Sequence, residues 1–242
     1  MSAGPSRRTG MLVPSVFVLA GVLTLLGLGT WQLERKAWKE ALIETLDRRQ
    51  NAAPVELPPP GQWDSVMPED LEFQRVRLRG EFLKADDALA YTSGSALRDD
   101  VKGQGYFVFS PMRLPDGRQV VVNRGFAPDR SYPRRTGPEE IVGALRWPEA
   151  PSWFVADRDS TGIWFMRDQR RMAEAHGWGP VAPFYIEQEA PIPPGGVPHP
   201  AALKLRLRND HLQYALTWFA LAIVFAVMFA IWTARRLRDR QG

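Results

Sequence analysis

The sequence predicts an α+β membrane protein in which two transmembrane helices flank a mostly antiparallel β domain that lies outside the membrane. Three observations predict this class: two uncharged apolar segments as long as a bilayer is thick, a central region with two-residue hydrophobic periodicity, and an excess of basic residues in two short tails. The chain has 242 residues, of which 45% are hydrophobic and 24% are charged, as expected of one globular domain with attachments. We therefore predict five segments: a tail at 1–10, a span at 11–31, the β domain at 32–210, a span at 211–234 and a basic tail at 235–242.

Both apolar segments lack charge over a length that suits a membrane span. Residues 9–33 and residues 211–234 contain no Asp, Glu, Lys or Arg. As a helix, residues 11–31 would extend roughly 31 Å, which matches the hydrocarbon core of a bilayer. A cleaved signal peptide is the alternative for the first segment, and a buried core helix is the alternative for the second. We favour two spans, because the first run exceeds a usual signal sequence and continues into helix-forming residues without a clear cleavage site.

The distribution of charge predicts the orientation in the membrane. Residues 1–33 carry a net charge of +2, residues 235–242 carry +3, and residues 34–210 carry 25 basic and 26 acidic side chains. Short basic flanks stay on the cytoplasmic side, so both termini are expected in the cytoplasm and the central domain outside. Because no Arg- and Ser-rich transit peptide precedes the first span, we expect a bacterial inner membrane with the domain in the periplasm, rather than the mitochondrial intermembrane space. The basic excess lies in the tails, so the high isoelectric point does not indicate binding to nucleic acid.

The central region begins with a helical continuation of the first span, to about Gln50, and a breaker-rich linker at residues 54–68. Residues 75–82 alternate charged with mostly apolar side chains, which predicts a strand with one solvent-exposed face. Residues 106–114 and 118–126 flank a Pro-Asp-Gly turn and predict a β-hairpin, because proline presets the dihedral angle φ and glycine tolerates positive φ. The strands are expected to close into a small barrel or a sandwich, since closure hides strand edges.

Weaker patterns predict the remaining elements of the domain. Four further strands are expected at residues 88–92, 141–147, 184–188 and 203–208. One short helix is expected from Asp168 to His176, ended by Gly177. Residues 190–201 are rich in Pro and Gly and are expected to form a loop. Glu139 and Glu140 are expected to begin a strand or to cap a turn.

The sequence offers no standard catalytic or metal-binding pattern, and we do not expect an enzyme. There is no cysteine, which excludes disulfides, thiolate ligands and cysteine nucleophiles. The three histidines, His176, His199 and His211, are far apart in sequence, and serine-hydrolase, phosphate-loop and zinc-protease motifs are missing. Delivery of Cu(I) is disfavoured because the seven methionines are scattered.

Several charged residues have a structural interpretation that we favour over a functional one. Arg75, Arg77 and Arg79 share one strand face and could hold propionates or phosphates, but a solvated face that resists aggregation is the simpler interpretation. His176 ends a predicted helix, where a cation is favourable. His199 lies in a Pro-rich loop and is expected to be exposed to solvent.

His211 is the strongest candidate for a functional residue. It is the first residue of the second apolar segment and follows Asn209 and Asp210, which are suited to cap a helix. Its helix face also carries Tyr214, Ala215, Trp218 and Ala222. An imidazole would thus stand at the outer membrane interface, where an opening over Ala215 could admit a flat apolar ligand and a neutral imidazole can bind haem iron. The alternative is an interfacial histidine within an aromatic belt that includes Trp31.

Three motifs occur in order along the chain. They are Gly29-Thr30-Trp31-Gln32-Leu33-Glu34-Arg35 at the end of the first span, Gly105-Tyr106-Phe107-Val108 with Pro111 leading to Asn123-Arg124-Gly125-Phe126-Ala127-Pro128, and Asn209-Asp210-His211-Leu212-Gln213-Tyr214-Ala215-Leu216-Thr217-Trp218-Phe219 at the start of the second span. Together they resemble the Surfeit locus protein 1 family, and the resemblance extends from about Leu12 to Trp232. The family usually has Trp where this chain has Phe126, which replaces one aromatic residue with another.

The resemblance implies that the chain is an assembly factor for haem-copper cytochrome c oxidase. Bacterial members are similar to haem a chaperones, which receive the cofactor from haem a synthase and help to place it in oxidase subunit I. The histidine that is the proposed haem ligand of the family corresponds to His211. The further residues that the resemblance suggests around haem are Trp31, Gln32, Tyr214, Trp218 and Arg124. For Arg124, which follows the predicted hairpin, a structural role that bridges strand ends is an equal alternative.

The mechanism that follows from the resemblance is weak ligation of haem a by His211 between the two spans. The farnesyl tail would lie along Ala215 and Ala222, and the β domain would dock on an oxidase subunit. Weak ligation is expected because a carrier must release its cargo.

Other functions fit parts of the sequence. The main alternative is a membrane scaffold that stabilises an early subunit I intermediate without touching haem, and it predicts co-purification with oxidase subunits but no bound haem. A periplasmic hydrolase would need an acid–base pair that the sequence does not display. A membrane-tethered solute sensor would need a larger cytoplasmic output region than the short C-terminal tail provides.

Overall fold

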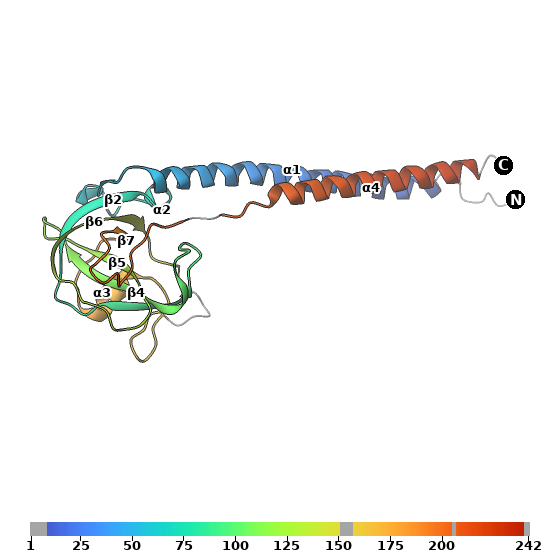
Figure 1. Ribbon diagram of the computed structural model, residues 1–242. Coiled ribbons are helices and arrows are strands. Elements are labelled where there is room, and N and C mark those ends of the chain that lie inside the picture. Colours follow the sequence, from blue (N-terminus) through green and yellow to red (C-terminus); the bar gives the residue numbers. More distant parts are fainter. Residues whose placement is uncertain (1–8, 151–156, 205–206, 240–242) are drawn as a thin grey trace. The chain divides into compact units, whose positions relative to one another are not determined.

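The computed structural model describes residues 9–150, 157–204 and 207–239, and the chain divides into two compact units (Figure 1). One unit is a pair of helices and contains Met1–Glu44 and Leu207–Gly242. The other is a β domain and contains Thr45–Arg206. The two long helices therefore form a unit apart from the sheet, as expected of the predicted α+β class.

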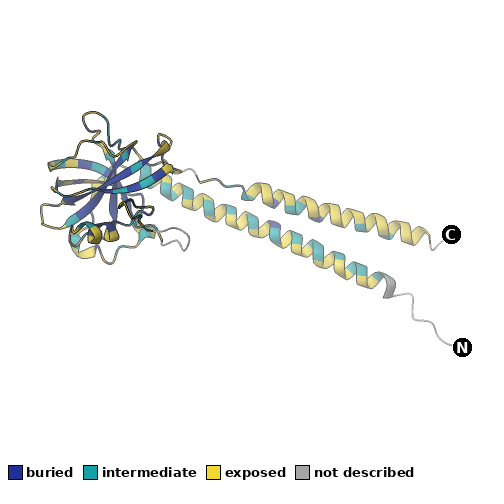
Figure 2. Cartoon of the chain, turned by 90° about the horizontal axis from the view of Figure 1, so that it is seen from below, coloured by how far each residue is buried: buried dark blue, intermediate teal, exposed yellow. Residues whose placement is uncertain are grey.

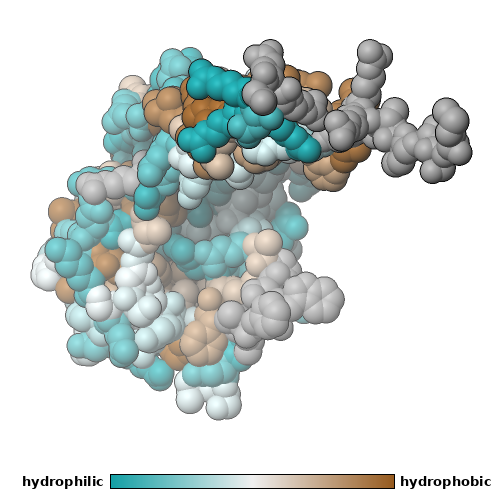
Figure 3. Space-filling view, turned by 90° about the vertical axis from the view of Figure 1, so that its right-hand side faces the viewer, coloured by the Kyte–Doolittle hydropathy of each residue, from teal (hydrophilic) through white to brown (hydrophobic). Residues whose placement is uncertain are grey.

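The helical unit consists of α4, His211–Arg238, and most of α1, Thr9–Asn51. Both helices are long and apolar enough to cross a membrane. Phe17 is 76% exposed and Ile223 is 64% exposed, so α4 is not a buried core helix. Exposed residues run along both helices in Figure 2, and hydrophobic side chains gather on the helix pair in Figure 3. As the sequence predicts, α1 continues past Trp31 without a break.

The two helices pack side by side and antiparallel (Figures 1 and 2). A Cβ atom added to Gly21 would lie 2.7 Å from Cε1 of Phe225, and one added to Gly29 would lie 2.4 Å from Cε1 of Phe219. The contact positions descend along α4 as they ascend along α1, which makes the pair antiparallel. At both places an aromatic ring of α4 rests directly on the α1 backbone, as small residues allow at helix interfaces in membranes.

The β domain is a seven-stranded sheet with two short α-helices and a 3₁₀ turn. Its elements are β1 Val55–Glu56, the 3₁₀ turn η1 Pro60–Gln62, α2 Pro68–Leu71, β2 Arg75–Phe82, β3 Ala88–Gly94, β4 Lys102–Arg113, β5 Gln119–Ala127, β6 Gly137–Arg146, α3 Gln169–His176 and β7 Tyr185–Ala190. The strand order is β1-β2-β6-β7-β5-β4-β3, and all neighbours are antiparallel except β1–β2 and β5–β7. The last two residues of β2, Glu81 and Phe82, also pair with β4, so β2, β6, β7, β5 and β4 form a closed ring.

The hairpin of β4 and β5 confirms the prediction from the Pro-Asp-Gly turn. Gly117 has a φ of 87°, and its N–H donates to the carbonyl of Leu114 at 2.9 Å. The Asp116 carboxylate accepts from the backbone N–H of Arg118 at 3.0 Å and closes the turn. The predicted helix α3 is also confirmed, since Asp168 caps its first N–H groups and Gly177 ends it with a φ of 65°.

Two hydrophobic clusters lie on the two faces of the ring. The first takes Val76, Leu78 and Phe82 from β2, Met112 from β4, Val120 and Val122 from β5, Ile141 and Leu145 from β6, and Ile186 from β7. Because all five ring strands contribute alternate residues, this cluster fills the inside of the ring. The second joins Val121 and Tyr185 to Met172 of α3, so α3 covers the outer face.

One predicted strand is wrong, and one predicted linker is more ordered than expected. Of the predicted strand 203–208, the described residues 203, 204, 207 and 208 are not in a strand, and residues 205 and 206 lie outside the described part. The N–H of Lys204 donates one backbone hydrogen bond to the carbonyl of Leu97, and the Leu203 side chain is buried. These contacts hold the segment in place of a ladder of strand hydrogen bonds. The stretch 54–68 contains β1 and the buried Trp63, whose ring packs 5.3 Å from that of Phe184. Its many prolines do not prevent this anchoring, because the Trp63 side chain supplies the apolar contact.

The remaining predicted strands are confirmed with small shifts at their ends. β6 begins at Gly137, earlier than the predicted residue 141, because Glu139 and Glu140 pair in register with Gly80 and Arg79 of β2. The loop at 190–201 is confirmed as well, apart from the last residue of β7 and an isolated bridge at His199.

Replacement of Gly125 by Ala should destabilise the β domain strongly. Gly125 has a φ of 113°, and a Cβ there would lie 2.1 Å from the backbone oxygen of His199. Backbone must move to relieve this clash, so we expect a loss of about 3 kcal/mol in the free energy of unfolding. Urea unfolding of the full chain in mild detergent measures it. The control is Gly61→Ala, where a Cβ meets nothing within 4 Å, and an equal loss in both variants would contradict the explanation.

The stability of the domain should fall above pH 10 because of Tyr185. This side chain is fully buried, its hydroxyl has no hydrogen-bond partner, and burial raises the pKa of Tyr185 to about 12. Between pH 10 and 12 the unfolded state loses the proton and the folded state keeps it, so stability decreases as the pH rises. Tyr185→Phe should remove this part of the pH dependence and leave stability at pH 7 unchanged or higher by about 1 kcal/mol. Tyr91→Phe, at a half-buried position, should keep the parental profile when unfolding is measured across this pH range.

Candidate functional site

The structure joins two of the predicted site residues directly. Gln32 lies in α1, His211 is the first residue of α4, and Nδ1 of His211 lies 2.7 Å from Oε1 of Gln32. An amide oxygen can only accept a hydrogen bond, so with Oε1 facing the ring this contact fits the tautomer that is protonated on Nδ1. In that tautomer Nε2 keeps its lone pair for another partner. A neutral imidazole of this form can ligate a metal through Nε2.

A second polar contact holds the same end of the helix pair. Nδ2 of Asn209 donates to the backbone oxygen of Lys36 at 3.5 Å, about one turn beyond Gln32 on α1. Asp210 occupies the N-cap position of α4, but its side chain makes no capping bond. Its carboxylate pairs instead with Arg208 at 2.5 Å, since charge-assisted bonds are the stronger ones. The helix starts where predicted, whereas the capping role predicted for the Asp210 side chain is wrong.

The opening predicted over Ala215 does not exist. Ala215 is 0% exposed and Ala222 is 3% exposed. Both share one face of α4 with Phe219, whose ring rests on Gly29 of α1. Close packing of the helices therefore covers Ala215 and Ala222. The expectation that a farnesyl tail lies along these two residues finds no exposed surface there, and haem binding by His211 stays a prediction.

The aromatic residues predicted near His211 remain accessible on the helical unit. Trp31 is 53% exposed and Tyr214 is 56% exposed, while Trp218 is half-buried. Aromatic side chains with a polar edge suit both a membrane interface and a flat ligand. Trp31 and Tyr214 are therefore free to contact either one.

Arg124, the remaining predicted site residue, belongs to the β domain and is 3% exposed. Its Nη2 donates to the backbone oxygen of Pro133 at 3.2 Å, and its Nη1 lies 3.8 Å from the Asp87 carboxylate. Burial lowers the pKa of Arg124, and the charge of Asp87 opposes this effect. Asp87 also accepts hydrogen bonds from Ser110 at 2.5 Å and Tyr132 at 3.2 Å. Arg124 therefore bridges β5, the β5–β6 connection and the β2–β3 connection, and it is in the other unit from Gln32 and His211.

The arginine face of β2 is neutralised by carboxylates. Arg75 pairs with Glu189 at 2.9 Å, and Arg79 and Arg77 pair with Glu140 at 2.6 and 3.7 Å. This arrangement supports the interpretation as a solvated face rather than an anion-binding ladder.

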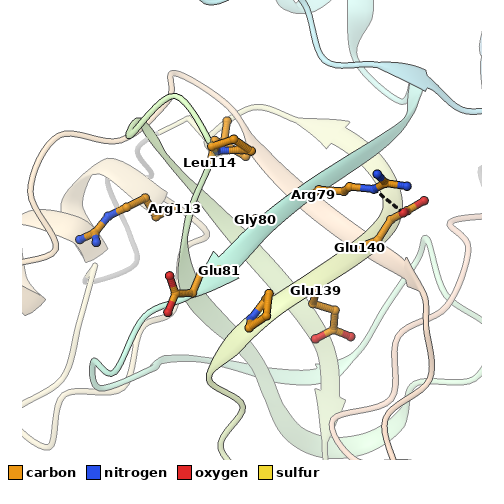
Figure 4. Close-up of a pocket in the computed structure, with 9 residues that line it drawn as sticks. Arg79, Gly80, Glu81, Arg113, Leu114, Glu139 and Glu140 are labelled. Carbon is orange, nitrogen blue, oxygen red and sulfur yellow. Dashed lines mark hydrogen bonds and ion pairs between the residues drawn. The ribbon is translucent and has the colours of Figure 1, made fainter.

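A groove of about 600 Å³ lies beside this face (Figure 4). Its lining residues are Arg79, Gly80, Glu81, Arg113, Leu114, Pro115, Pro138, Glu139 and Glu140. Figure 4 shows acidic and basic side chains around the same groove, with Arg79 bonded to Glu140. Two basic side chains face three acidic ones there, so the groove does not favour an anion.

The other two histidines differ from expectation in their surroundings. His176 is the last residue of α3, as predicted, and burial lowers its pKa, with the charge of Arg158 as a second cause, so burial favours the neutral ring over the cation that suits a helix end. His199 is half-buried rather than exposed. Its backbone bonds to both the N–H and the carbonyl of Phe126, and its oxygen also accepts from Arg98 at 2.8 Å.

Comparison with known proteins gives a consistent result across nearly the whole chain. The model of the SURF1 family matches residues 19–223. The chain belongs to the SURF1 family. It is 33% identical to a SURF1-like protein of Drosophila melanogaster over 229 residues, which cover 85% of this chain and 73% of the relative. It is 32% identical to a SURF1-like protein of Monosiga brevicollis over 99% of this chain and 94% of the relative, and 30% identical to Surfeit locus protein 1 of Homo sapiens over 91% and 76%.

The three motifs that suggested the SURF1 family have distinct places in the structure. The first and third supply Gln32 and His211 to the contact between α1 and α4. The middle motif maintains the β domain: Nδ2 of Asn123 donates to the buried Glu187 carboxylate at 2.9 Å, and its Oδ1 accepts from the N–H of Gly125 at 3.1 Å. Sequence reasoning placed all these residues but missed the direct bond from Gln32 to His211. The signal for it was that both stand at the same end of two antiparallel spans.

Replacement of Gly29 by Leu should weaken the pairing of α1 and α4 in this SURF1-family chain. The new side chain must displace the Phe219 ring, and such overpacking costs about 1–3 kcal/mol. Because the chain has no cysteine, Gln32→Cys with His211→Cys gives a unique pair for a short bifunctional thiol reagent. The cross-linking yield should fall with Gly29→Leu and stay unchanged with Gly27→Leu, where a Cβ meets nothing within 4 Å. Equal yields in both backgrounds would show that helix contact at Gly29 is not needed.

Proposed function

We propose that this SURF1-family chain is a non-catalytic assembly factor for cytochrome c oxidase that binds haem a through His211 and aids its insertion into subunit I. Membership of the family and the motifs around both spans support the role in oxidase assembly. The observation that carries the haem proposal is the hydrogen bond between Nδ1 of His211 and Gln32, which leaves Nε2 free. Haem a is the cargo in this proposal.

A single histidine ligand, His211, suits a haem better than a free metal ion. Among the described residues, no group of three or more His, Asp or Glu side chains could hold a metal ion. Haem iron is already held by its macrocycle and needs only one axial ligand from the protein, which a neutral imidazole can supply. One ligand of this kind also suits a carrier, because a single bond allows release.

The packing of the helices restricts where haem could bind. Since Ala215 and Ala222 are buried, a haem must approach His211 from an exposed side of the helix pair. The exposed aromatic residues Trp31 and Tyr214 are the candidates for contact with its macrocycle.

The proposed setting is the inner membrane, with α1 and α4 spanning the bilayer, both termini in the cytoplasm and the β domain in the periplasm. The exposed apolar side chains of both helices and the basic ends support it. Haem a synthase is the proposed donor of haem and subunit I the proposed acceptor, with the β domain docked on an oxidase subunit.

A scaffold that stabilises subunit I without haem is the second candidate. It is favoured by one observation: the helices pack closely where the Phe219 ring rests on Gly29, and Ala215 and Ala222 are buried. Large apolar side chains such as Phe17 and Ile223 would then contact helices of subunit I. This candidate predicts binding to subunit I that does not change when His211 is replaced.

His211→Ala should abolish haem binding without loss of folding. The full chain is purified in mild detergent from cells that make haem a, and bound haem is measured by absorption and pyridine haemochrome spectra. The parent should carry haem a, and the variant should lose the absorption bands of histidine-ligated haem and at least about 90% of the haem, since the iron loses its only axial ligand from the protein. His176→Ala is the control and should keep both. A His211→Ala protein with the parental spectrum and haem content would refute ligation by His211.

A further inference from the structure

We propose that Gln32 is a positioning residue that fixes the tautomer of His211 and thereby sets the strength of its bond to haem iron. This inference rests on the proposed function only for its last step. The selection of the tautomer is a property of the protein without haem.

The geometry of the pair defines the tautomer. Oε1 of Gln32 lies 2.7 Å from Nδ1 of His211, which is a short and therefore well-formed hydrogen bond. The amide oxygen offers only lone pairs, so the proton must reside on Nδ1. An imidazole without such a partner can place its proton on either nitrogen, and the form with the proton on Nε2 cannot ligate through that atom.

The position of Gln32 is held from both sides along α1. Gly29, one turn earlier, contacts the Phe219 ring, and the backbone oxygen of Lys36, one turn later, accepts from Asn209. Gln32 therefore faces the start of α4 in a register that two separate contacts maintain. Its side chain is half-buried, which shields the bond from competing water.

The charged side chains that the structure describes near His211 interact with other partners, and not with its ring. Lys36 pairs with Glu40 at 2.7 Å, and Arg35 lies over the Trp38 ring at 3.9 Å. Asp210, next to His211 in sequence, is paired with Arg208. Among the described residues, Gln32 is the side chain that bonds to the His211 ring.

A partner on the second ring nitrogen changes how a histidine binds a metal. Such a partner orients the ring and raises the basicity of the ligating nitrogen, and its loss typically costs 10- to 100-fold in affinity. A carboxylate in place of the amide should strengthen the effect, because it is a stronger acceptor. Removing the acceptor and replacing it with a stronger one should therefore shift the reduction potential of the haem iron in opposite directions. A purely structural role of Gln32 would not have this effect.

The first arm of the test needs no haem. ¹⁵N spectra of histidine-labelled full chain in detergent, at a pH where imidazole is neutral, report which ring nitrogen carries the proton, and His211→Ala identifies the His211 signals among the three histidines. The parent and Gln32→Glu should show the proton on Nδ1. Gln32→Leu should move it wholly or partly to Nε2. A proton on Nε2 in the parent, or a Gln32→Leu protein with the same share of the proton on Nδ1 as the parent, would overturn the inference.

The second arm uses added haem a. Gln32→Leu should weaken binding about 10- to 100-fold and raise the reduction potential of the bound haem, and Gln32→Glu should lower that potential. Gln213→Leu replaces an exposed glutamine in the first turn of α4 and should match the parent. Unchanged affinity in Gln32→Leu, or potentials that shift in the same direction in both variants, would overturn the inference.

The two arms separate this inference from the proposed function. If His211→Ala keeps haem while the parent shows Nδ1 protonated in a Gln32-dependent way, the haem proposal fails and the role of Gln32 in positioning the ring stands. If His211→Ala loses haem and the Gln32 variants behave as the parent, ligation stands and the positioning role fails.

Discussion

The close antiparallel approach of α1 and α4 is the constraint on which the candidate site depends. In lipid there is no hydrophobic driving force between helices, so two membrane spans, as proposed for α1 and α4, would associate through shape and polar contacts. Gly21 and Gly29 provide the shape, because each lets an aromatic ring of α4 rest on the α1 backbone. The same approach brings the Gln32 side chain within hydrogen-bonding distance of the His211 ring. It also buries Ala215, so the opening that the sequence suggested over this residue is not formed.

In the β domain, a small closed sheet holds long connections in place. The ring of five strands is filled by one apolar cluster, and polar residues at its rim attach the connections. Three consecutive residues of β5 illustrate this. Asn123 bonds to Glu187, and Arg124 bonds to the β5–β6 connection. Gly125, which has no side chain, lets the backbone of His199 pass closely. The motif that most resembled a functional signature in this domain is thus explained by folding. The motifs on the helices are explained by the contact between them, which is where the proposed function resides.

The strongest sequence patterns predicted structure well, and the failures share one cause. Uncharged apolar runs, the alternation in residues 75–82 and the Pro-Asp-Gly turn each depend on local physics, and each corresponds to an observed element. The strand predicted at residues 203–208 failed because alternation shows only that a segment could pair, and the neighbour available to Lys204 offers a single bond. The prediction of an opening over Ala215 was wrong because a small residue is compatible both with an opening and with a close contact. The partner helix decides between them.

By itself, the sequence determined the two apolar helices, the β-rich character of the middle and the identity of the family, and it singled out His211 as a candidate site residue. Those conclusions depend on composition, period and motif, which are properties of residues near one another in the chain. Only the tertiary structure decided which atoms meet across it: Gln32 with His211, Phe219 with Gly29, and Arg124 with Asp87. The reason is physical, since a hydrogen bond or a van der Waals contact depends on separations of a few ångströms. Those separations are set by how whole elements pack, and no local pattern contains that information.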